Sequence, residues 1–580
     1  MHYIVRACYG MAAIAAFAVV ANAAPAPSYD ILIKGGMIYD GSGAAPFVGD
    51  VGITADRIAY VGPQSRATAK RVINAKGQAV SPGFINMLSW STDSLLVDGR
   101  GQSELRQGVT LEVMGEGWSM GPLTPEMKQL AEQRQGDIKY KIDWTTLGEY
   151  LEKLEKLGIS MNVASFVGAT TVRVHELGEG DVQPKASQLK RMRTLVRQAM
   201  EEGALGVGSS LIYAPASYSK TPELTALMQE AGQCGGMYIS HMRSEGDRIE
   251  GAIDELIAIS RASKAPAEIY HLKVAGRSNW SKLPAVLAKI EAERAKGNRI
   301  TADMYVYEAG ATGLDAAMPG WVQAGGLEKW IARLKDPATR KRVIAEMREP
   351  NTSWENLYYH AGADGVLFLG FRSEKLKPLT GKRLSEVAKM RGTSPEDTII
   401  DLVIEDDSRV EVAYFLMSED NIAKQVALPY VSFGSDEAAR APEGVFLKSN
   451  PHPRSYGNFA RVLAKYVRDE KRMSMQEAIR KLTSLPAANL SLHERGALKQ
   501  GYFADVVVFD PKTIQDHATF EKPQQFATGV RSVVVNGVEA LKDGEPTGAA
   551  SGRVVRGRAW KGWEDGGCRK SPGDWAWAKN

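Results

Sequence analysis

The feature that most constrains this chain is a regular alternation, between residues 81 and 490, of short apolar runs with longer segments of helical periodicity. Such alternation is typical of parallel strands joined by crossover helices. Eight runs are assigned as strands: Gly83–Leu88, Thr110–Met114, Asn162–Val167, Leu205–Ser209, Met237–His241, Glu268–Leu272, Ile300–Tyr305 and Val431–Gly434. Because eight is the strand number of a TIM barrel, the sequence predicts an α/β fold with a (β/α)8 barrel over residues 81–490.

One segment of the barrel region is too long to be a crossover. Residues 320–430 are predicted to form a helical insertion over the barrel mouth. Outside the barrel, residues 24–80 and 491–552 both have the sequence pattern of short strands joined by tight turns. Two strand-rich ends around one long middle predict a small β-sandwich domain built from both termini. The basic tail at 553–580 is expected to be a solvated surface.

The N-terminus has the pattern of a secretory signal. Arg6 precedes an apolar run at 7–21, and the small-x-small pattern of Ala21-Asn22-Ala23 follows it. The run is shorter than the roughly 20 residues that a membrane-spanning helix needs. We therefore expect residues 1–23 to be a signal peptide, and the mature chain to be periplasmic or secreted, with no membrane segment.

Composition narrows the class of protein further. With 580 residues, 44% of them hydrophobic, the chain is long and apolar enough for a large core. Its formal net charge of +4 is nearly balanced, so composition indicates no nucleic-acid partner. Without residues 1–23 only Cys234 and Cys568 remain, which are too few for a disulfide framework, so we expect stability to come from the core.

Two histidines stand at matching strand ends. Of the eight histidines in the chain, one lies in the predicted signal, and His241 and His271 end consecutive predicted strands. The active sites of barrel enzymes lie at this end of the strands, and neutral imidazole is a common zinc ligand. The alternative is a pair of hydrogen-bonded structural histidines. A pair at matching positions favours a metal site.

A catalytic zinc usually has three protein ligands and an open position. Glu116 follows the strand-like run that ends at Met114 and lies between two glycines, so its carboxylate is the candidate for the third ligand. Glu112 lies on the same face of the predicted strand as Glu116 and is the alternative third ligand. A glutamate at a turn is also often merely solvated.

Three charged side chains complete the candidate site. Asp436 lies at the tip of the last predicted strand, where it could act as a general base toward a metal-activated water, or could instead cap a following helix. Arg454 and Lys273 could bind a substrate carboxylate, or could be surface ion-pair partners.

At these residues the chain resembles the amidohydrolase superfamily, and within it the D-aminoacylases, which deacylate N-acyl-D-amino acids. The resemblance runs from Tyr29 to about Gly552. It is carried by an ordered set of motifs: Ser81-Pro82-Gly83-Phe84-Ile85, Gln107-Gly108-Val109-Thr110, Gly208-Ser209-Ser210-Leu211-Ile212-Tyr213-Ala214-Pro215, Ser240-His241-Met242-Arg243, His271-Leu272-Lys273, Asp303-Met304-Tyr305-Val306-Tyr307, Gly434-Ser435-Asp436 and His452-Pro453-Arg454. The ordered set is far more specific than any single motif.

The resemblance implies a role for each matching residue. It implies that His241 and His271 bind the tighter zinc and that Asp436 is the catalytic aspartate. It also implies substrate-carboxylate contacts, which map onto Tyr213, Lys273, Tyr305 and Arg454, with Tyr307 as a second choice beside Tyr305.

The chain departs from the family pattern at two places. Leu88-Ser89-Trp90 stands where the superfamily has His-x-His, and Gly115-Glu116-Gly117 stands where D-aminoacylases have a cysteine. Glutamate is an acceptable zinc ligand, whereas neither leucine nor tryptophan is. We therefore expect one zinc ion per chain, held by Glu116, His241 and His271.

The expected function is zinc-dependent hydrolysis of a linear amide bond in an N-acyl (D-)amino-acid-like substrate, releasing a carboxylate and a free amine. The expected partner is this small-molecule amide, and the sequence leaves a homo-oligomer open. One alternative is hydrolysis of another carbon–nitrogen bond, in a dipeptide, a cyclic amide or an amide xenobiotic. Another is a non-catalytic binding protein with a decayed metal site.

Overall fold

The computed structural model describes residues 28–350 and 353–568. Its centre is a parallel barrel, and each of the eight predicted strands is present within a few residues of its expected bounds. The barrel strands are β6 (Phe84–Asn86), β7 (Val109–Met114), β8 (Asn162–Ser165) with its continuation β9 (Val167–Gly168), β10 (Gly206–Ser210), β11 (Met237–His241), β12 (Ala267–Ile269), β13 (Ile300–Met304) and β17 (Val431–Phe433).

Backbone hydrogen bonds close these strands into a ring. They pair in parallel in the orders β6-β7-β8 and β9-β10-β11-β12-β13-β17. Between the two ladders, the N–H of Leu205 donates to the carbonyl of Ser165 at 3.0 Å. At the other seam the N–H of Met87, just after β6, donates to the carbonyl of Phe433 at 3.2 Å. The strand ends of β6 and β17 are therefore neighbours, although they are far apart in the sequence.

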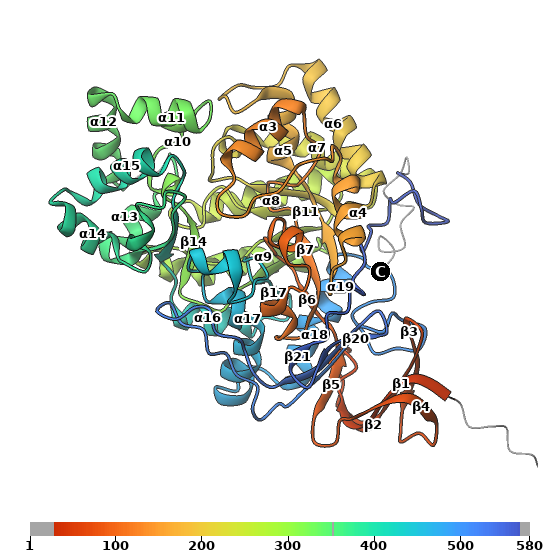
Figure 1. Cartoon of the computed structure of the whole chain (residues 1–580). Coiled ribbons are helices and arrows are strands. Elements are labelled where there is room, and N and C mark those ends of the chain that lie inside the picture. Colours follow the sequence, from red (N-terminus) through yellow and green to blue (C-terminus); the bar gives the residue numbers. More distant parts are fainter. Residues whose placement is uncertain (1–27, 351–352, 569–580) are drawn as a thin grey trace, which may run out of the picture.

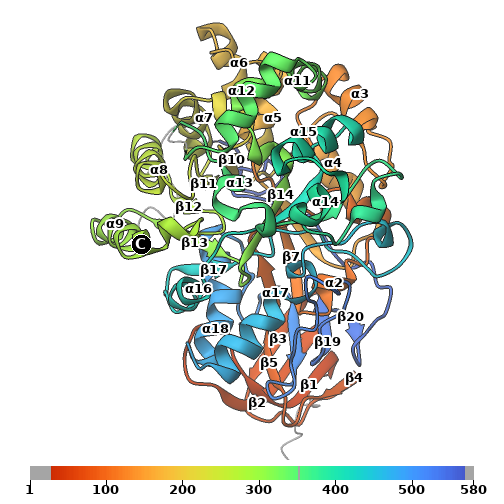
Figure 2. The ribbon, with the colours of Figure 1, turned by 90° about the vertical axis from the view of Figure 1, so that its left-hand side faces the viewer.

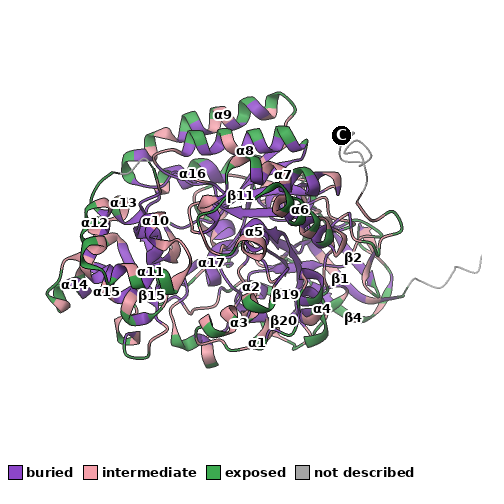
Figure 3. Cartoon of the chain, turned by 90° about the horizontal axis from the view of Figure 1, so that it is seen from above, coloured by how far each residue is buried: buried purple, intermediate pink, exposed green. Residues whose placement is uncertain are grey.

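Helices cover the outside of the barrel (Figure 1). The longer ones are α4 (Leu147–Leu157), α6 (Ala186–Glu201), α7 (Thr221–Gln233), α8 (Ile249–Ser263) and α9 (Leu283–Ala295). The start of α4 is set by a capping box, in which Thr146 and Glu149 satisfy backbone N–H groups of the first turn. Viewed from above, α8 and α9 are exposed on their outer faces and buried on the faces toward the barrel (Figure 3).

Strands from both ends of the chain form one sheet below the barrel. Its order is β21-β20-β19-β18-β5-β1-β2-β3, with β4 paired to β1. Figure 2 shows the late strands β19 and β20 beside the early strands of this sheet. The strands are β1 (Ser28–Ile38), β2 (Phe47–Thr54), β3 (Arg57–Gly62), β4 (Thr68–Asn74), β5 (Ala79–Pro82), β18 (Val506–Phe509), β19 (Val530–Val535), β20 (Val538–Lys542) and β21 (Glu545–Pro546). A sheet built from both termini is thus present, whereas its folding as a separate β-sandwich domain stays a prediction.

The segment predicted as a helical insertion also contains strands. Its helices include α11 (Leu327–Leu334), α12 (Pro337–Met347), α13 (Leu357–Ala361), α14 (Leu384–Arg391) and α15 (Pro395–Asp406). Beside them β16 (Glu411–Phe415) pairs antiparallel with both β14 (Ala309–Gly313) and β15 (Val366–Gly370). These short strands were not predicted from the sequence, because their partners lie far apart and none of them is long enough to show a periodic pattern. This small sheet contributes to the wall of the candidate site.

The end of the chain differs from its prediction. The N–H of Val555 donates to the carbonyl of Val163 at 2.8 Å, and the N–H of Val163 donates to the carbonyl of Arg553 at 3.0 Å. Cys568 forms a disulfide with Cys234, which follows α7. The expectation of a solvated tail was therefore wrong for 553–568, because backbone pairing and a covalent bond hold this segment on the barrel.

Two further expectations concern the ends and the membrane. The predicted signal peptide at 1–23 and the last residues of the tail lie outside the described residues. Within 28–350 and 353–568, no helix combines the length and apolar composition that crossing a membrane requires.

Candidate metal and catalytic site

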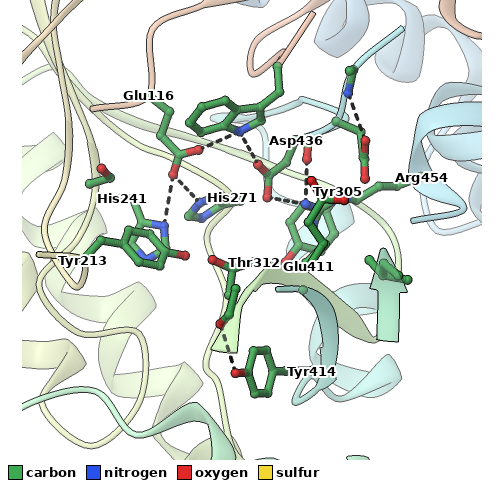
Figure 4. Close-up of a pocket in the computed structure, with 18 of the residues that line it drawn as sticks. Glu116, Tyr213, His241, His271, Tyr305, Thr312, Glu411, Tyr414, Asp436 and Arg454 are labelled. Carbon is green, nitrogen blue, oxygen red and sulfur yellow. Dashed lines mark hydrogen bonds and ion pairs between the residues drawn. The ribbon is translucent and has the colours of Figure 1, made fainter. Parts of the chain in front are cut away.

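A cavity of about 590 Å³ opens at the carboxyl ends of the barrel strands. Its lining includes all eight predicted site residues, which come from different strands and loops: Glu116, Tyr213, His241, His271, Lys273, Tyr305, Asp436 and Arg454. Figure 4 shows Glu116 and the two histidines on one side of the cavity and Asp436 with Arg454 on the other. The barrel rim thus gathers residues that are more than 300 positions apart in the sequence.

Glu116, His241 and His271 converge on one point. Glu116 Oε1 lies 3.0 Å from His241 Nδ1 and 3.1 Å from His271 Nε2. One candidate ligand atom from each residue lies within 4.8 Å of the other two, and all three side chains are buried. Burial acts to raise the pKa of Glu116, but hydrogen bonds with both histidines outweigh it and hold this pKa below its ordinary value.

The backbone around Glu116 explains how its carboxylate reaches this point. Gly115 directly follows β7 and adopts φ of 108°, in the left-handed region that favours glycine. A Cβ at Gly115 would come within 2.4 Å of the carbonyl oxygen of Phe166. The strand can therefore turn sharply at Gly115 while staying in contact with its neighbour, so that Glu116 points into the cavity.

This donor set fits a zinc ion. Two imidazole nitrogens and one carboxylate oxygen are the three-ligand set found in catalytic zinc sites, which keep a fourth position open. Glu112, the alternative third ligand, is not part of the set. Its carboxylate lies inside the barrel, where Oε2 accepts a hydrogen bond from Asn86 Nδ2 at 3.1 Å.

A carboxylate that the sequence analysis missed lies behind both histidines. Glu245 Oε1 is 3.0 Å from His271 Nδ1, and Glu245 Oε2 is 3.7 Å from His241 Nε2. These are the ring nitrogens that face away from Glu116. Metal-ligating histidines usually donate their second ring N–H to a carboxylate or carbonyl, which fixes the ring. The distance to His271 Nδ1 permits such a bond, whereas His241 Nε2 has no hydrogen-bond partner. The spacing of four residues between His241 and Glu245 was the available signal.

Lys273 is held by the same network. Its Nζ lies 2.7 Å from Glu245 Oε1 and 2.8 Å from His271 Nδ1. Burial acts to lower the pKa of Lys273, but the charge and hydrogen bond of Glu245, together with Tyr305 and Asp436, outweigh it and raise this pKa. The ammonium group therefore stays charged at the cavity wall, but part of its hydrogen-bonding capacity is already used.

Asp436 lies across the cavity, three residues after the end of β17. It adopts φ of 51°, which aspartate tolerates better than most residues. Its Oδ2 lies 2.9 Å from Arg454 Nη2. Burial raises the pKa of Asp436, although the charge of Arg454 opposes this shift. No helix begins directly after Asp436, so the alternative of a helix cap has no support in this part of the chain.

Arg454 has hydrogen-bond donors that are not used within the protein. Its side chain is 1% exposed, and Nη2 donates to the backbone carbonyl of Asp436 at 2.6 Å. Its Nε and Nη1 have no hydrogen-bond partner, and neither has the hydroxyl of Tyr305, over whose ring the guanidinium lies at 4.2 Å. Tyr213 lines the same cavity next to His241, with 5.2 Å between the ring centroids. Tyr307, the second choice, instead packs against His452 and is not among the lining residues.

The strand end that lacks the His-x-His pattern carries no ligand. Leu88 is fully buried in a hydrophobic cluster. The indole N–H of Trp90 points to the site, with Nε1 at 3.1 Å from Glu116 Oε2 and at 3.1 Å from Asp436 Oδ1. A neutral donor therefore stands between the two carboxylates.

Comparisons with known proteins agree with this geometry. The model of the amidohydrolase family matches residues 71–540. D-aminoacylase from Alcaligenes xylosoxydans xylosoxydans is 32% identical over 532 residues, which cover 91% of this chain and 97% of that protein.

Two solved structures extend the comparison. A structure of D-aminoacylase, described as having a binuclear metal centre with one-metal activation and second-metal attenuation, superposes with a TM-score of 0.75 at 31% identity, covering 91% of this chain and 100% of that one. N-acyl-D-glutamate deacylase from Bordetella bronchiseptica, complexed with zinc and a phosphonate that mimics the tetrahedral intermediate, superposes with a TM-score of 0.73 at 28% identity, again over 91% and 100% of the two chains.

The parallel barrel, the converging candidate metal ligands and these matches define the class of the protein: the chain belongs to the amidohydrolase family. It is a metal-dependent hydrolase of carbon–nitrogen bonds other than peptide bonds. Within the family it lies in the D-aminoacylase-like branch, and the resemblance found in its sequence motifs is confirmed.

Proposed function

We propose that the chain hydrolyses the linear amide bond of N-acyl-D-amino-acid-like substrates, releasing a carboxylate and a free amine. The observation that carries this proposal is the convergence of Glu116, His241 and His271 in one cavity with Asp436 and Arg454. D-aminoacylase and the N-acyl-D-glutamate deacylase are relatives whose names state this kind of reaction.

The chain's own residues suit the proton transfers of amide hydrolysis. A zinc ion bound by Glu116, His241 and His271 would polarise the amide carbonyl and lower the pKa of a water molecule. Asp436 accepts one proton of the attacking water and returns it to the leaving amine nitrogen as the carbon–nitrogen bond breaks. The acyl product becomes a carboxylate when the second proton of the water passes to solvent. Burial raises the pKa of Asp436, which makes its carboxylate a stronger base toward the proton of the attacking water.

The substrate's carboxylate is assigned to the side of the cavity that holds Arg454. Nη1 of Arg454, which has no hydrogen-bond partner, can donate to an oxygen of this carboxylate while Nη2 keeps Asp436 in place. Tyr213, Tyr305 and the charged Lys273 are the further groups that can contact this carboxylate or its neighbours. Removing the carboxylate by esterification should therefore weaken binding.

We propose one zinc ion per chain. Leu88 and Trp90 offer no ligand atoms where the superfamily has two histidines. The relative with a binuclear centre is activated by one metal and attenuated by the second, so a single ion is compatible with activity.

We also propose export. The signal-like pattern at 1–23 and the disulfide between Cys234 and Cys568 both suit the periplasm or the extracellular space. Mass spectrometry of protein from the native host should find an N-terminus near Ala24. An intact Met1 would contradict this proposal.

One experiment separates the proposed function from its alternatives. The purified protein is assayed on matched N-acyl-D- and N-acyl-L-amino acids, on their methyl esters, and on dipeptides and cyclic amides, with zinc content measured on the same preparation. We expect about one zinc per chain and preferential hydrolysis of N-acyl-D-amino acids with a free carboxylate. Preference for a dipeptide or cyclic amide would replace this function with another carbon–nitrogen hydrolysis, and a zinc-loaded protein inactive on every class would support a binding protein.

A further inference from the structure

The half-buried Trp90 has an unusual place in the site. Its single indole N–H is shared between two carboxylates, with Nε1 at 3.1 Å from both Glu116 Oε2 and Asp436 Oδ1. Glu116 uses its other oxygen toward the two histidines, and Asp436 uses its other oxygen toward Arg454. Trp90 therefore links the metal-ligand set to the proposed general base.

Two carboxylates this close and this buried repel each other unless something positive lies between them. Glu116 is 4% exposed, so little solvent is available to screen it. Among the described residues, the indole N–H of Trp90 is the group that points at Glu116 Oε2 and Asp436 Oδ1. The guanidinium of Arg454 contacts the other oxygen of Asp436, Oδ2. The indole N–H carries a partial positive charge and thus occupies the position where a cation would compensate both acids.

The backbone makes this placement rigid. The N–H of Asp436 donates to the carbonyl of Leu88 at 2.8 Å, and the N–H of Trp90 donates to the carbonyl of Glu437 at 2.9 Å. The two segments therefore run side by side as a short parallel ladder beyond the ends of β6 and β17. A side chain on this ladder has its direction fixed by the barrel itself.

We infer that Trp90 is a positioning residue that takes the place of a second cation. Its indole N–H orients the free oxygen of Glu116 and the near oxygen of Asp436, and its ring excludes an ion from the space between them. This inference rests on the proposed function for its effect on turnover, whereas its effect on zinc binding is independent of any substrate.

The test uses the full chain with two substitutions at Trp90. Trp90→Phe removes the N–H and retains an aromatic ring, and Trp90→His offers a ligand nitrogen near the two carboxylates. Trp321→Phe is the matched control, because Trp321 Nε1 donates to a carboxylate oxygen of Glu346 at 3.0 Å and Trp321, in α10 (Gly320–Gln323), is not among the residues that line the cavity. Circular dichroism melts identify any variant that fails to fold.

Zinc affinity is measured first, by competition with a chelator, together with the zinc content of each variant at increasing zinc concentration. We expect Trp90→Phe to bind zinc about 10–100-fold more weakly, the usual cost of removing a group that orients a metal ligand. Its content should stay at one ion, because the ring still blocks the space. Trp90→His should approach two ions per chain in excess zinc.

Turnover is measured on the N-acyl-amino acid that the wild type hydrolyses best. At saturating zinc, Trp90→Phe should lose about tenfold in kcat with KM nearly unchanged, because Asp436 is disturbed and the carboxylate contacts are not. Trp321→Phe should stay within twofold of the wild type in all measurements.

Two results would overturn the inference: a Trp90→Phe variant with wild-type zinc affinity and kcat, or a folded Trp90→His variant that never exceeds one ion. If no substrate is hydrolysed at all, the proposed function fails, but zinc affinity and stoichiometry still decide the role of Trp90.

Discussion

The two halves of the barrel rim differ in how they compensate the negative charge of their buried carboxylates. At the ends of β11 and β12, His241 and His271 present nitrogen ligands, and Glu245 lies behind both rings. At the ends of β6 and β17, Leu88 is buried in the core, and Trp90 gives one neutral N–H to two acids. The β11–β12 half can bind a cation, whereas in the β6–β17 half the indole N–H of Trp90 takes the place of a cation.

Electrostatic compensation differs in the same way. On the β11–β12 half, the acid Glu245 is matched by the charged Lys273 and by two imidazoles. Below the β6–β17 half, Glu104 has no hydrogen-bond partner for either carboxylate oxygen, and Glu112 in β7 has none for Oε1. Burial raises the pKa of both Glu104 and Glu112, so a charged site lies beside buried carboxyls that hold their protons more tightly than usual. The comparison predicts that substitutions on the first half act on metal binding, and those on the second half on proton transfer and stability.

The largest effect is expected on the metal-binding half. His241→Ala or His271→Ala removes one of only three ligands, so zinc retention and turnover should both be abolished. Zinc content after gel filtration and the hydrolysis rate check this on one preparation. His517→Ala, which removes a histidine on the exposed surface, is the control and should keep both. A His271→Ala enzyme that still holds a full zinc ion would place the metal elsewhere.

The next effect belongs to the β6–β17 half. Asp436→Asn keeps the shape of the side chain but removes its basic carboxylate, so zinc should stay while kcat falls about 10²–10⁴-fold. Metal content and rate are measured together. If the variant loses zinc, Asp436 is itself a ligand. If it keeps normal turnover, another group activates the water.

The sequence could predict the elements that repeat or that end a strand. The eight barrel strands are buried apolar runs between helical segments, and this pattern is local. His241 and His271 were recognisable because each closes such a run. Glu116 was recognisable because glycines on both sides let the chain turn. These features depend on residues that are neighbours in the sequence, so that local pattern made them candidates, and the family resemblance chose between Glu116 and Glu112.

The features that were missed depend on distant contacts. β15 and β16 are short strands whose pairing is fixed only once the insertion folds. The bond between Cys234 and Cys568 joins positions 334 residues apart, and no local pattern indicates it. The part played by Trp90 follows from the seam between the first and last barrel strands, which sequence neighbours do not reveal. Chemistry at strand ends was thus predictable, and chemistry across the seam was not.

A smaller effect is expected from Glu245. Glu245→Gln keeps the size of the side chain but weakens its hold on the outer ring nitrogens, so zinc affinity should fall about 10–100-fold, with any loss of turnover restored by added zinc. Chelator competition measures the affinity. Glu255→Gln, which removes an ion pair with Arg243 on the outside of the same region, should leave affinity unchanged. An unchanged affinity for Glu245→Gln would remove Glu245 from the metal site.

The smallest effect concerns Glu112, and it acts on stability. Burial raises the pKa of Glu112 from 4.5 to about 7, although hydrogen bonds with Ser89 and Asn86 oppose this shift. Because the folded chain holds this proton more tightly than the unfolded chain, the folded state binds more protons between pH 4.5 and 7. Stability should therefore fall as pH rises through this window, and the loss should be complete above it.

Glu112→Gln removes this titratable carboxyl group. The glutamine amide can donate an N–H toward the oxygens of Glu104, which have no hydrogen-bond partner. Relative to the wild type, the free energy of unfolding of the variant should therefore increase by about 2–3 kcal/mol as the pH is raised from 5 to 8. Urea unfolding at the two pH values measures the difference, and Glu152→Gln on the exposed surface is the control. Zinc content and turnover should stay at wild-type levels, because Glu112 lies inside the barrel and outside the cavity. Two results would contradict this prediction: a variant whose stability relative to the wild type is the same at pH 8 as at pH 5, or a variant that loses zinc. Loss of zinc would again make Glu112 the alternative to Glu116 as third ligand.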